Sequence, residues 1–277
     1  MRKTLARLRP ATVYALMALF LLWTLAPIAW IATMSVQPEI NYISVPPQLR
    51  LEQTSLRWYL AMLTEPDFLA AMQASAIISF VTMTLCLVIG SLAAYPLARL
   101  KMPHRNAYLT ASVVSRMVPA MILIIPMFLL LRTLRLLDTY LGLILVYTAF
   151  LLPYVIWMLK NFFEQVPYAL EAAARMDGCS RLGALVRVII PVTAPGIVAT
   201  AVFAFIGAWN EFLFGLILST RNAVPITVRL SSLVSTTFHS DTSLVAAGGM
   251  LSLLPPVLLV FVLNRFIVRG LVEGMKY

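Results

Sequence analysis

The chain has few charged side chains. Only 12% of its 277 residues are Asp, Glu, Lys or Arg, and 61% are hydrophobic, whereas a soluble domain carries about 25% charged residues. The mean hydropathy is +0.90. This composition excludes an ordinary soluble domain and predicts a polytopic membrane protein. The net charge of +10 does not predict nucleic-acid binding, because the basic residues lie between apolar runs rather than along one face or arm.

The sequence also lacks the residues of most enzyme sites. Its two cysteines, Cys86 and Cys179, are far apart and fit neither a disulfide framework nor a metal site, and His104 and His239 are isolated. None of its lysines closes a phosphate-binding G-x-x-x-x-G-K-[ST] loop. We also find no H-E-x-x-H motif, paired-acid site or nucleophile elbow. We therefore predict no catalytic residue, no metal site and no cofactor bound by this chain.

What the sequence has instead is a series of long apolar runs. A membrane-spanning helix needs about 20 apolar residues. Six runs are candidates: 12–34, 71–97, 108–131, 140–159, 197–218 and 245–266. The first exceeds the apolar part of a signal peptide and is interpreted as an uncleaved span. The sequence thus predicts an all-α fold with six transmembrane helices.

These runs belong to one predicted transmembrane domain over 1–277. Its core is 71–266, with 12–34 as an additional N-terminal helix. Segment 35–70 is predicted to be a loop with a short surface helix. No internal repeat is visible, which suggests half of a transport pathway, completed by another chain.

The distribution of basic residues predicts the orientation in the membrane. Most of the 21 lysines and arginines fall in segments on the same side as the N-terminus, and such segments usually face the cytoplasm. We therefore predict that both termini are cytoplasmic. In this orientation 160–196 faces the cytoplasm and 35–70 faces outward.

The cytoplasmic segment contains a helical hairpin, LEAAARMDGCSRLGALVRVIIP, at 170–191. Pro167 suits the first helical position, and Gly178 can adopt the left-handed conformation that ends a helix. Ser180 can then cap a second helix. That second helix is predicted to carry one apolar stripe formed by Leu182, Leu185, Val186 and Ile189.

The first helix of this hairpin presents Ala172, Ala173 and Met176 on one side. Small side chains let another backbone approach closely. One interpretation is an interfacial connector packed on its own bundle. The other is a short helix that inserts into a groove on a cytoplasmic partner.

The hairpin resembles the EAA loop of permease subunits of ATP-binding-cassette importers. That pattern is Glu-Ala-Ala, three residues, Gly, nine residues and Ile-x-Leu-Pro. With Gly178 as its glycine, Val188, Ile190 and Pro191 occupy the closing positions. The family's glutamate position is Ala172 here, and Glu171 lies one residue earlier. The carbohydrate branch often has two adjacent glutamates, of which this sequence keeps the first.

Three further stretches resemble the maltose-permease type of sugar importer. They are AAYPLARLKMP at 93–103, FIGAWNEFLF at 205–214 and the C-terminal RGLVEGMKY at 269–277. The resemblance implies the type I importer permease fold in the cell membrane. It further implies a homologous second permease, two ATPase subunits that hold ATP and Mg, an extracytoplasmic sugar-binding protein and membrane lipid as partners, with no nucleic acid.

The resemblance also implies which residues couple transport to ATP hydrolysis. Arg175 or Arg181 would pair with acids on the ATPase, and Asp177 would hydrogen-bond at the turn. Lys276 would reach between the ATPases. The full predicted coupling set is Glu171, Ala172, Ala173, Arg175, Met176, Asp177, Gly178, Arg181 and Lys276.

A second candidate site lies inside the fifth apolar run. A charge at the membrane centre is costly, so Asn210 and Glu211 are expected to face a polar cavity or a partner. We assign them to the translocation pathway together with Trp209, which can stack on a sugar. The alternatives are a structural hydrogen bond between subunits and a tryptophan packed between helices.

We predict a permease subunit that moves a sugar into the cytoplasm. A di- or oligosaccharide is the leading candidate. No residue identifies the sugar. The main alternative is a stand-alone gradient-driven transporter, for which Glu211 would be the coupling acid. A membrane enzyme lacks supporting motifs, and a membrane assembly factor remains open from the sequence.

Overall fold

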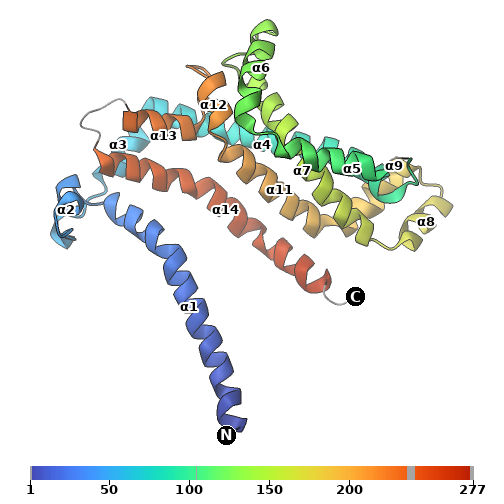
Figure 1. Cartoon of the computed structure of the whole chain (residues 1–277), viewed down its shortest axis with the longest axis horizontal. Coiled ribbons are helices and arrows are strands. Elements are labelled where there is room, and N and C mark those ends of the chain that lie inside the picture. The colour runs from blue at the N-terminus through green and yellow to red at the C-terminus, as the bar shows by residue number, and fades with distance from the viewer. Residues whose placement is uncertain (1, 104, 236–240, 275–277) are drawn as a thin grey trace. The chain divides into compact units, whose positions relative to one another are not determined.

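The computed structural model describes residues 2–103, 105–235 and 241–274, and these form helices and connecting segments without strands. Figure 1 shows the helices along the chain. They are α1 (Arg2–Met34), α2 (Glu39–Ile43), η1 (Leu51–Gln53), α3 (Arg57–Thr64), α4 (Pro66–Arg99), α5 (Arg105–Val114), η2 (Ser115–Met117), α6 (Ala120–Thr133), α7 (Tyr140–Gln165), α8 (Tyr168–Met176), α9 (Arg181–Ala184), η3 (Leu185–Ile189), α10 (Ile190–Val192), α11 (Ala194–Trp209), α12 (Leu213–Leu218), α13 (Ile226–Ser235) and α14 (Thr242–Gly274). The all-α prediction is confirmed.

Four of the predicted spans are single helices of membrane length. They are Thr12–Met34 within α1, Pro66–Arg99, Tyr140–Gln165 and Thr242–Asn264 within α14. Each contains most or all of one predicted apolar run. Length and apolar composition were therefore sufficient to locate these four helices.

The third predicted span, 108–131, is not one helix. It is divided between α5 and α6 by the short 3-10 turn η2 and an extended step at Val118 and Pro119. Proline has no N–H to donate, and it disfavours helical geometry in the residue before it. At 14 residues, α6 is too short to cross a bilayer alone.

The fifth predicted span, 197–218, is also broken. Helix α11 ends at Trp209, and α12 begins at Leu213. In addition, the segment Arg181–Val192 meets α11 at an angle of 84°. The described residues thus contain four helices able to cross a membrane, or five if this bent pair is one span. The count of six is not confirmed by the helices themselves.

The chain forms two compact units, so the predicted single domain stays a prediction. Unit 1 comprises residues 1–69 and 230–253. Its segment 35–64 contains α2 and α3, where the sequence predicted one short surface helix. Buried amides organise this segment: Asn41 Nδ2 donates to Gln37 Oε1 and to Gln53 Oε1, both at 2.8 Å. Trp58 Nε1 donates to the Asp241 carboxylate at 2.5 Å.

Unit 2, residues 70–229 and 254–277, contains the hairpin and the broken fifth run. Its core is built from apolar faces of α4, α7 and α11. At Gly196, an added Cβ would lie 2.4 Å from the ring of Phe162, so glycine allows α11 to approach α7 closely. One core cluster joins Cys86 of α4 and Val155 of α7 to Leu185 and Ile189 of the hairpin. The hairpin therefore packs against α4 and α7.

Candidate functional site

The hairpin begins with α8, whose C-terminal end is specified by its sequence. Pro167 lies just before the helix in an extended conformation, one residue earlier than predicted. At the other end Gly178 has φ +88°, as predicted. Gly178 N donates to Arg175 O at 3.2 Å, and Cys179 N donates to Ala174 O at 3.0 Å. This pair of bonds is a Schellman motif, which satisfies carbonyls that the helix end leaves free.

The second half of the hairpin begins as predicted and then differs. Ser180 Oγ accepts from Gly183 N at 3.0 Å and caps α9. The helix widens into a π-helical turn at Leu185–Ile189. Leu185 and Ile189 are buried, whereas Leu182 and Val186 are more than half exposed. The prediction of one stripe from all four residues was wrong, because the wider π turn changes which positions share a face.

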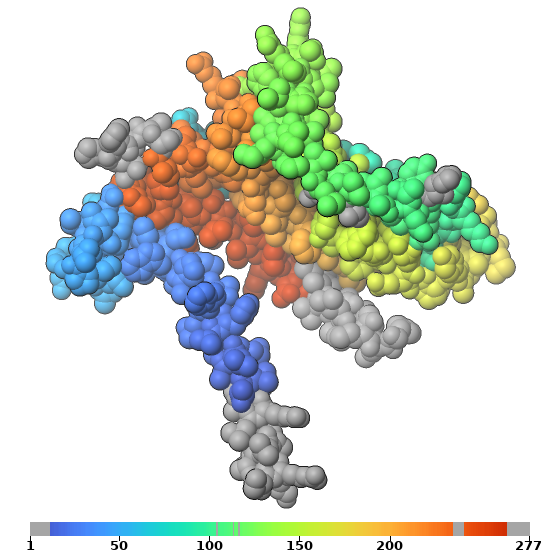
Figure 2. Space-filling view, in the orientation of Figure 1, coloured from blue at the N-terminus to red at the C-terminus, as the bar shows by residue number. Residues whose placement is uncertain are grey.

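Helix α8 has two different faces. Ala172, Ala173 and Arg175 are exposed, and Met176 is 83% exposed. Asp177, Gly178 and Arg181 are exposed around the turn that follows. Figure 1 shows α8 and α9 beyond the end of α7 in unit 2, and Figure 2 shows their yellow residues at the surface there. The exposed face of α8 is therefore largely apolar, with Arg175 on the helix and Arg181 beyond the turn.

The opposite face of α8 is directed into unit 2. Glu171 and Ala174 are buried. Tyr95 Oη donates to Glu171 Oε1 at 2.5 Å, and Arg99 Nε lies 3.5 Å from Glu171 Oε2. The structure thus separates Glu171 from the exposed members of the predicted coupling set. Lys276, the last member of that set, lies outside the described residues.

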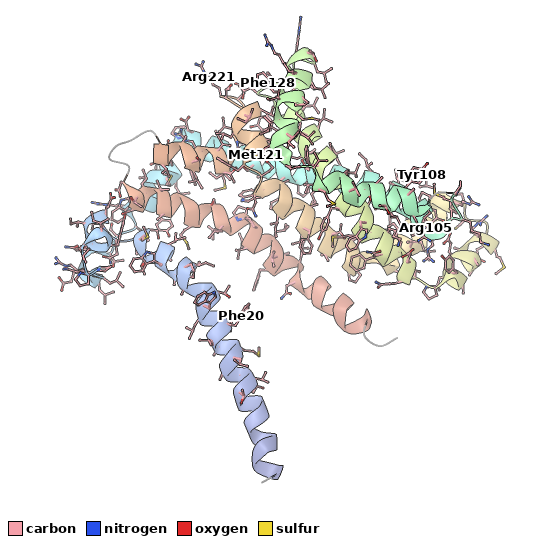
Figure 3. The ribbon with its side chains drawn as sticks, viewed as in Figure 1. Phe20, Arg105, Tyr108, Met121, Phe128 and Arg221 are labelled. Atoms are coloured by element: carbon pink, nitrogen blue, oxygen red, sulfur yellow. The ribbon has the colours of Figure 1, made fainter. Side chains whose placement is uncertain are left out.

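A second ion cluster lies at the same end of unit 2. Arg105 pairs with Glu164, and Lys160 Nζ lies 2.7 Å from the other carboxylate oxygen of Glu164. Figure 3 labels Arg105 at the start of α5, near α8 and α9. Sequence analysis missed this cluster. The i,i+4 spacing of Lys160 and Glu164 was the available signal, whereas pairing with Arg105 depends on the tertiary fold.

The three residues of the second candidate site have different environments. Trp209 is 3% exposed and stacks on Phe205, with ring centroids 5.6 Å apart. Asn210 is exposed at the break between α11 and α12. The Glu211 carboxylate accepts from Phe214 N at 3.0 Å and from Gly215 N at 3.1 Å. Glu211 therefore satisfies free N–H groups at the start of α12.

Asp138 has a comparable role that the sequence did not reveal. It lies between α6 and α7, and its carboxylate accepts hydrogen bonds from the backbone N–H groups of residues 220–223 and from Asn222 Nδ2. Burial opposes its ionisation, but these backbone bonds outweigh burial and lower the pKa of Asp138. Figure 3 labels Arg221 in this region of unit 2, away from Arg105.

An all-α chain with several membrane-length helices has the architecture of a polytopic membrane protein. The family described as binding-protein-dependent transport system inner membrane component matches residues 86–273. The chain belongs to this family. The matched region includes the hairpin and the break between α11 and α12.

Curated relatives match over nearly their whole length. The trehalose transport system permease protein SugB of Mycobacterium tuberculosis is 34% identical, over 96% of this chain and 97% of the relative. The trehalose/maltose transport system permease protein MalG of Thermococcus litoralis is 30% identical, over 90% of each chain. These matches confirm the resemblance to carbohydrate importer permeases.

A solved structure shares the fold. A chain from the crystal structure of a bacterial ABC transporter involved in the import of the acidic polysaccharide alginate aligns with a TM-score of 0.78. The alignment covers 94% of this chain and 96% of that chain at 22% identity. The match confirms an importer permease fold.

Proposed function

We propose that this chain is the permease subunit of an ATP-binding-cassette importer that moves a sugar into the cytoplasm. The leading candidate is a di- or oligosaccharide. The observation that carries the proposal is the full-length similarity to permeases named for trehalose and maltose transport. The solved alginate transporter, which handles a polysaccharide, has the same fold. Both support a carbohydrate as the solute class.

We propose that the exposed face of α8 is the docking surface for an ATPase subunit. Ala172, Ala173 and Met176 offer small and adaptable contacts. Arg175 and Arg181 lie beside them and can pair with acidic side chains on the ATPase. ATP and Mg would be bound by that partner. With six spans and the hairpin in the cytoplasm, both termini of the chain would also be cytoplasmic.

The proposed complex contains further subunits. A second permease would complete the pathway, because one chain supplies only half of it. An extracytoplasmic binding protein would deliver the sugar. A solved alginate transporter is described in complex with an alginate pentasaccharide-bound periplasmic protein, and a chain of it aligns at a TM-score of 0.69. We place Asn210 beside the pathway, since it is exposed at the helix break.

No observation favours the gradient-driven alternative. That mechanism needs an acid free to gain and lose a proton, and Glu211 was the candidate. Both oxygens of its carboxylate accept backbone hydrogen bonds. The carboxylate therefore has a structural role at the start of α12. In the importer, Glu211 and Trp209 would support the pathway by fixing α11 and α12.

The proposal is tested by purifying the tagged chain in mild detergent and identifying its partners by mass spectrometry. We expect an ATP-binding-cassette ATPase and a second permease. Reconstitution with the binding protein should then give sugar uptake that requires ATP. Recovery of the folded chain alone, with uptake that an uncoupler abolishes, would contradict the proposal and favour the gradient-driven carrier.

A further inference from the structure

The buried face of α8 is joined to the end of α4 by three side chains, which we call the α4–α8 anchor: Tyr95, Arg99 and Glu171. Tyr95 and Arg99 are four residues apart and lie on one face of the last turns of α4. Tyr95 donates to one oxygen of Glu171 at 2.5 Å, and Arg99 Nε is 3.5 Å from the other. The single carboxylate thus contacts both side chains of α4.

Arg99 also holds the residues that lead into α8. Its Nη2 donates to the carbonyl of Val166 at 2.7 Å. Its guanidinium lies over the ring of Tyr168, 4.7 Å from the centroid. Tyr168 Oη in turn donates to Ala98 O at 3.4 Å. The start of α8 is therefore fixed to α4 at several points, all within unit 2.

If the α4–α8 anchor served only stability, it would pack α8 at a high cost in desolvation free energy. The Arg99 side chain is fully buried, and that of Glu171 is 11% exposed. Removing two charges from water costs free energy that their attraction often fails to recover. Apolar side chains would pack this interface with less desolvation. What an ion pair and directed hydrogen bonds add is a defined orientation of one helix against the other.

The two faces of α8 are thus chemically distinct. The exposed face has small residues and no acid, while the acid points toward α4. In the coupling set implied by resemblance, Glu171 belonged with the ATPase-docking residues. Its burial, its hydrogen bond from Tyr95 and its ion pair with Arg99 give it a different role.

We infer that Glu171 is a positioning residue that connects α8 to α4, so that a displacement of α8 moves the end of α4. The inference rests on the proposed docking of an ATPase to the exposed face of α8. The anchor transmits movement between the docking surface and a membrane-length helix, and it takes no part in docking itself. Without it, α8 still binds the ATPase but moves independently of α4.

The first test needs neither partner nor transport. Backbone amide exchange in α8 is measured for the full purified chain carrying Glu171→Gln. Exchange should accelerate by about tenfold or more, because glutamine keeps an acceptor for Tyr95 but removes the charge that pairs with the buried Arg99. Arg175→Gln on the exposed face is the matched control and should leave exchange unchanged. Unchanged exchange in Glu171→Gln would overturn the anchor.

The second test uses the reconstituted complex with its ATPase and binding protein. Glu171→Gln and Tyr95→Phe should retain the ATPase and its hydrolysis, while sugar imported per ATP falls by about fivefold or more, within the usual range of coupling between sites. Loss of the ATPase from both variants would overturn the inference, because it would make the anchor part of docking.

A third variant separates positioning from simple stabilisation. Arg99→Met combined with Glu171→Met replaces the buried pair by apolar side chains, an exchange that often preserves or improves stability. We expect thermal stability near that of the wild type, with sugar imported per ATP still low. Recovery of import together with stability would show a merely structural contact. If the wild-type chain recruits no ATPase, the proposed function fails, while the exchange experiment still decides the anchor.

Discussion

The hairpin at 168–192 and the helix break at 209–213 both contain an acid that suggested contact with a partner or substrate. In both regions the acid instead bonds within the chain. Glu171 reaches across to side chains of α4, whereas Glu211 satisfies backbone N–H groups of the helix that follows it. An isolated acidic residue in a strongly hydrophobic chain can therefore mark a contact that holds the fold together, as well as a position that binds a ligand.

The two regions also differ in how their backbone is specified. The hairpin turns at a glycine and restarts at a serine, both of which are visible in the sequence. The break at Asn210 has no glycine or proline and is surrounded by apolar residues. Its geometry depends on the Glu211 cap and on Thr227, whose hydroxyl donates to Glu211 O at 2.8 Å. The hairpin turn is thus marked by a glycine and a serine, whereas the break at Asn210 is held by side-chain hydrogen bonds of Glu211 and Thr227.

The largest effect is expected from Gly178→Pro, which tests the local turn. Gly178 has φ +88°, and proline is restricted to about −65°. The substitution also removes the N–H that bonds to Arg175 O. The cost is about 3 kcal/mol or more, so α8 should lose its defined end. Sugar uptake and stimulated ATP hydrolysis should be abolished, with membrane insertion intact.

Gly178→Asn is the matched control for this turn. A Cβ at this position would meet no atom within 4 Å, and asparagine tolerates the left-handed conformation better than other residues with a side chain. Uptake should therefore be largely retained. Normal uptake by Gly178→Pro would contradict the role of this hairpin in coupling.

The next effect, from Glu211→Ala, tests the break that side-chain hydrogen bonds hold in place. The substitution leaves Phe214 N and Gly215 N without their acceptor. Loss of a helix cap costs about 1 kcal/mol, and up to ~2 kcal/mol, so the thermal unfolding temperature in detergent should fall. Transport should decrease while the complex remains assembled.

Glu211→Gln keeps one acceptor oxygen and should retain about half of the lost stability. An equal fall in transport for Glu211→Gln and Glu211→Ala, with no fall in stability for either, would contradict the capping role. Such a result would instead favour a charge requirement in the translocation pathway. Loss of assembly would favour a contact between subunits.

The parts of the structure that sequence reasoning found are those with local causes. Four spans, the Gly178 turn and the Ser180 cap follow from hydropathy, glycine geometry and a hydroxyl at a helix start. The break at Pro119 had a local signal too, but proline is common in membrane helices. The π turn at Leu185–Ile189 had none, because it depends on packing of the hairpin against α4 and α7.

The same distinction between local and tertiary causes applies to the candidate sites. Exposure of Ala172 and Met176 was predictable from helical spacing. The orientation of Glu171 was not, because Tyr95 and Arg99 lie more than seventy residues earlier and only the fold brings them together. Asp138 was missed for the same reason, since its partners at 220–223 are more than eighty residues away.

A smaller effect is expected from lowering the pH, which protonates Asp138 and weakens its long-range contact with residues 220–223. Its pKa is lower in the folded chain than in the unfolded one, so the unfolded state binds protons more readily as the pH falls. The stabilisation from Asp138 is fully present above its unfolded pKa of about 4. It is lost progressively as the pH falls through the folded pKa.

The measurement is the unfolding temperature of wild type and Asp138→Asn between neutral and acidic pH. The wild type should be more stable at neutral pH, and the difference should shrink as the solution is acidified. A difference that stays constant with pH would show that the loop at 220–223 does not depend on the charge of Asp138.

The smallest effect on the chain itself is expected from Arg175→Gln, on the exposed face of α8. Arg175 is exposed, so the substitution should change the free energy of unfolding by less than about 0.5 kcal/mol. If this face docks an ATPase, the loss should instead be in affinity for that partner, measured by titrating the ATPase onto the reconstituted permease. The weakening should be greater at low salt, where an exposed ion pair contributes most. An unchanged affinity at every salt concentration would remove Arg175 from the docking surface and leave the small residues Ala172 and Ala173 as its main contacts.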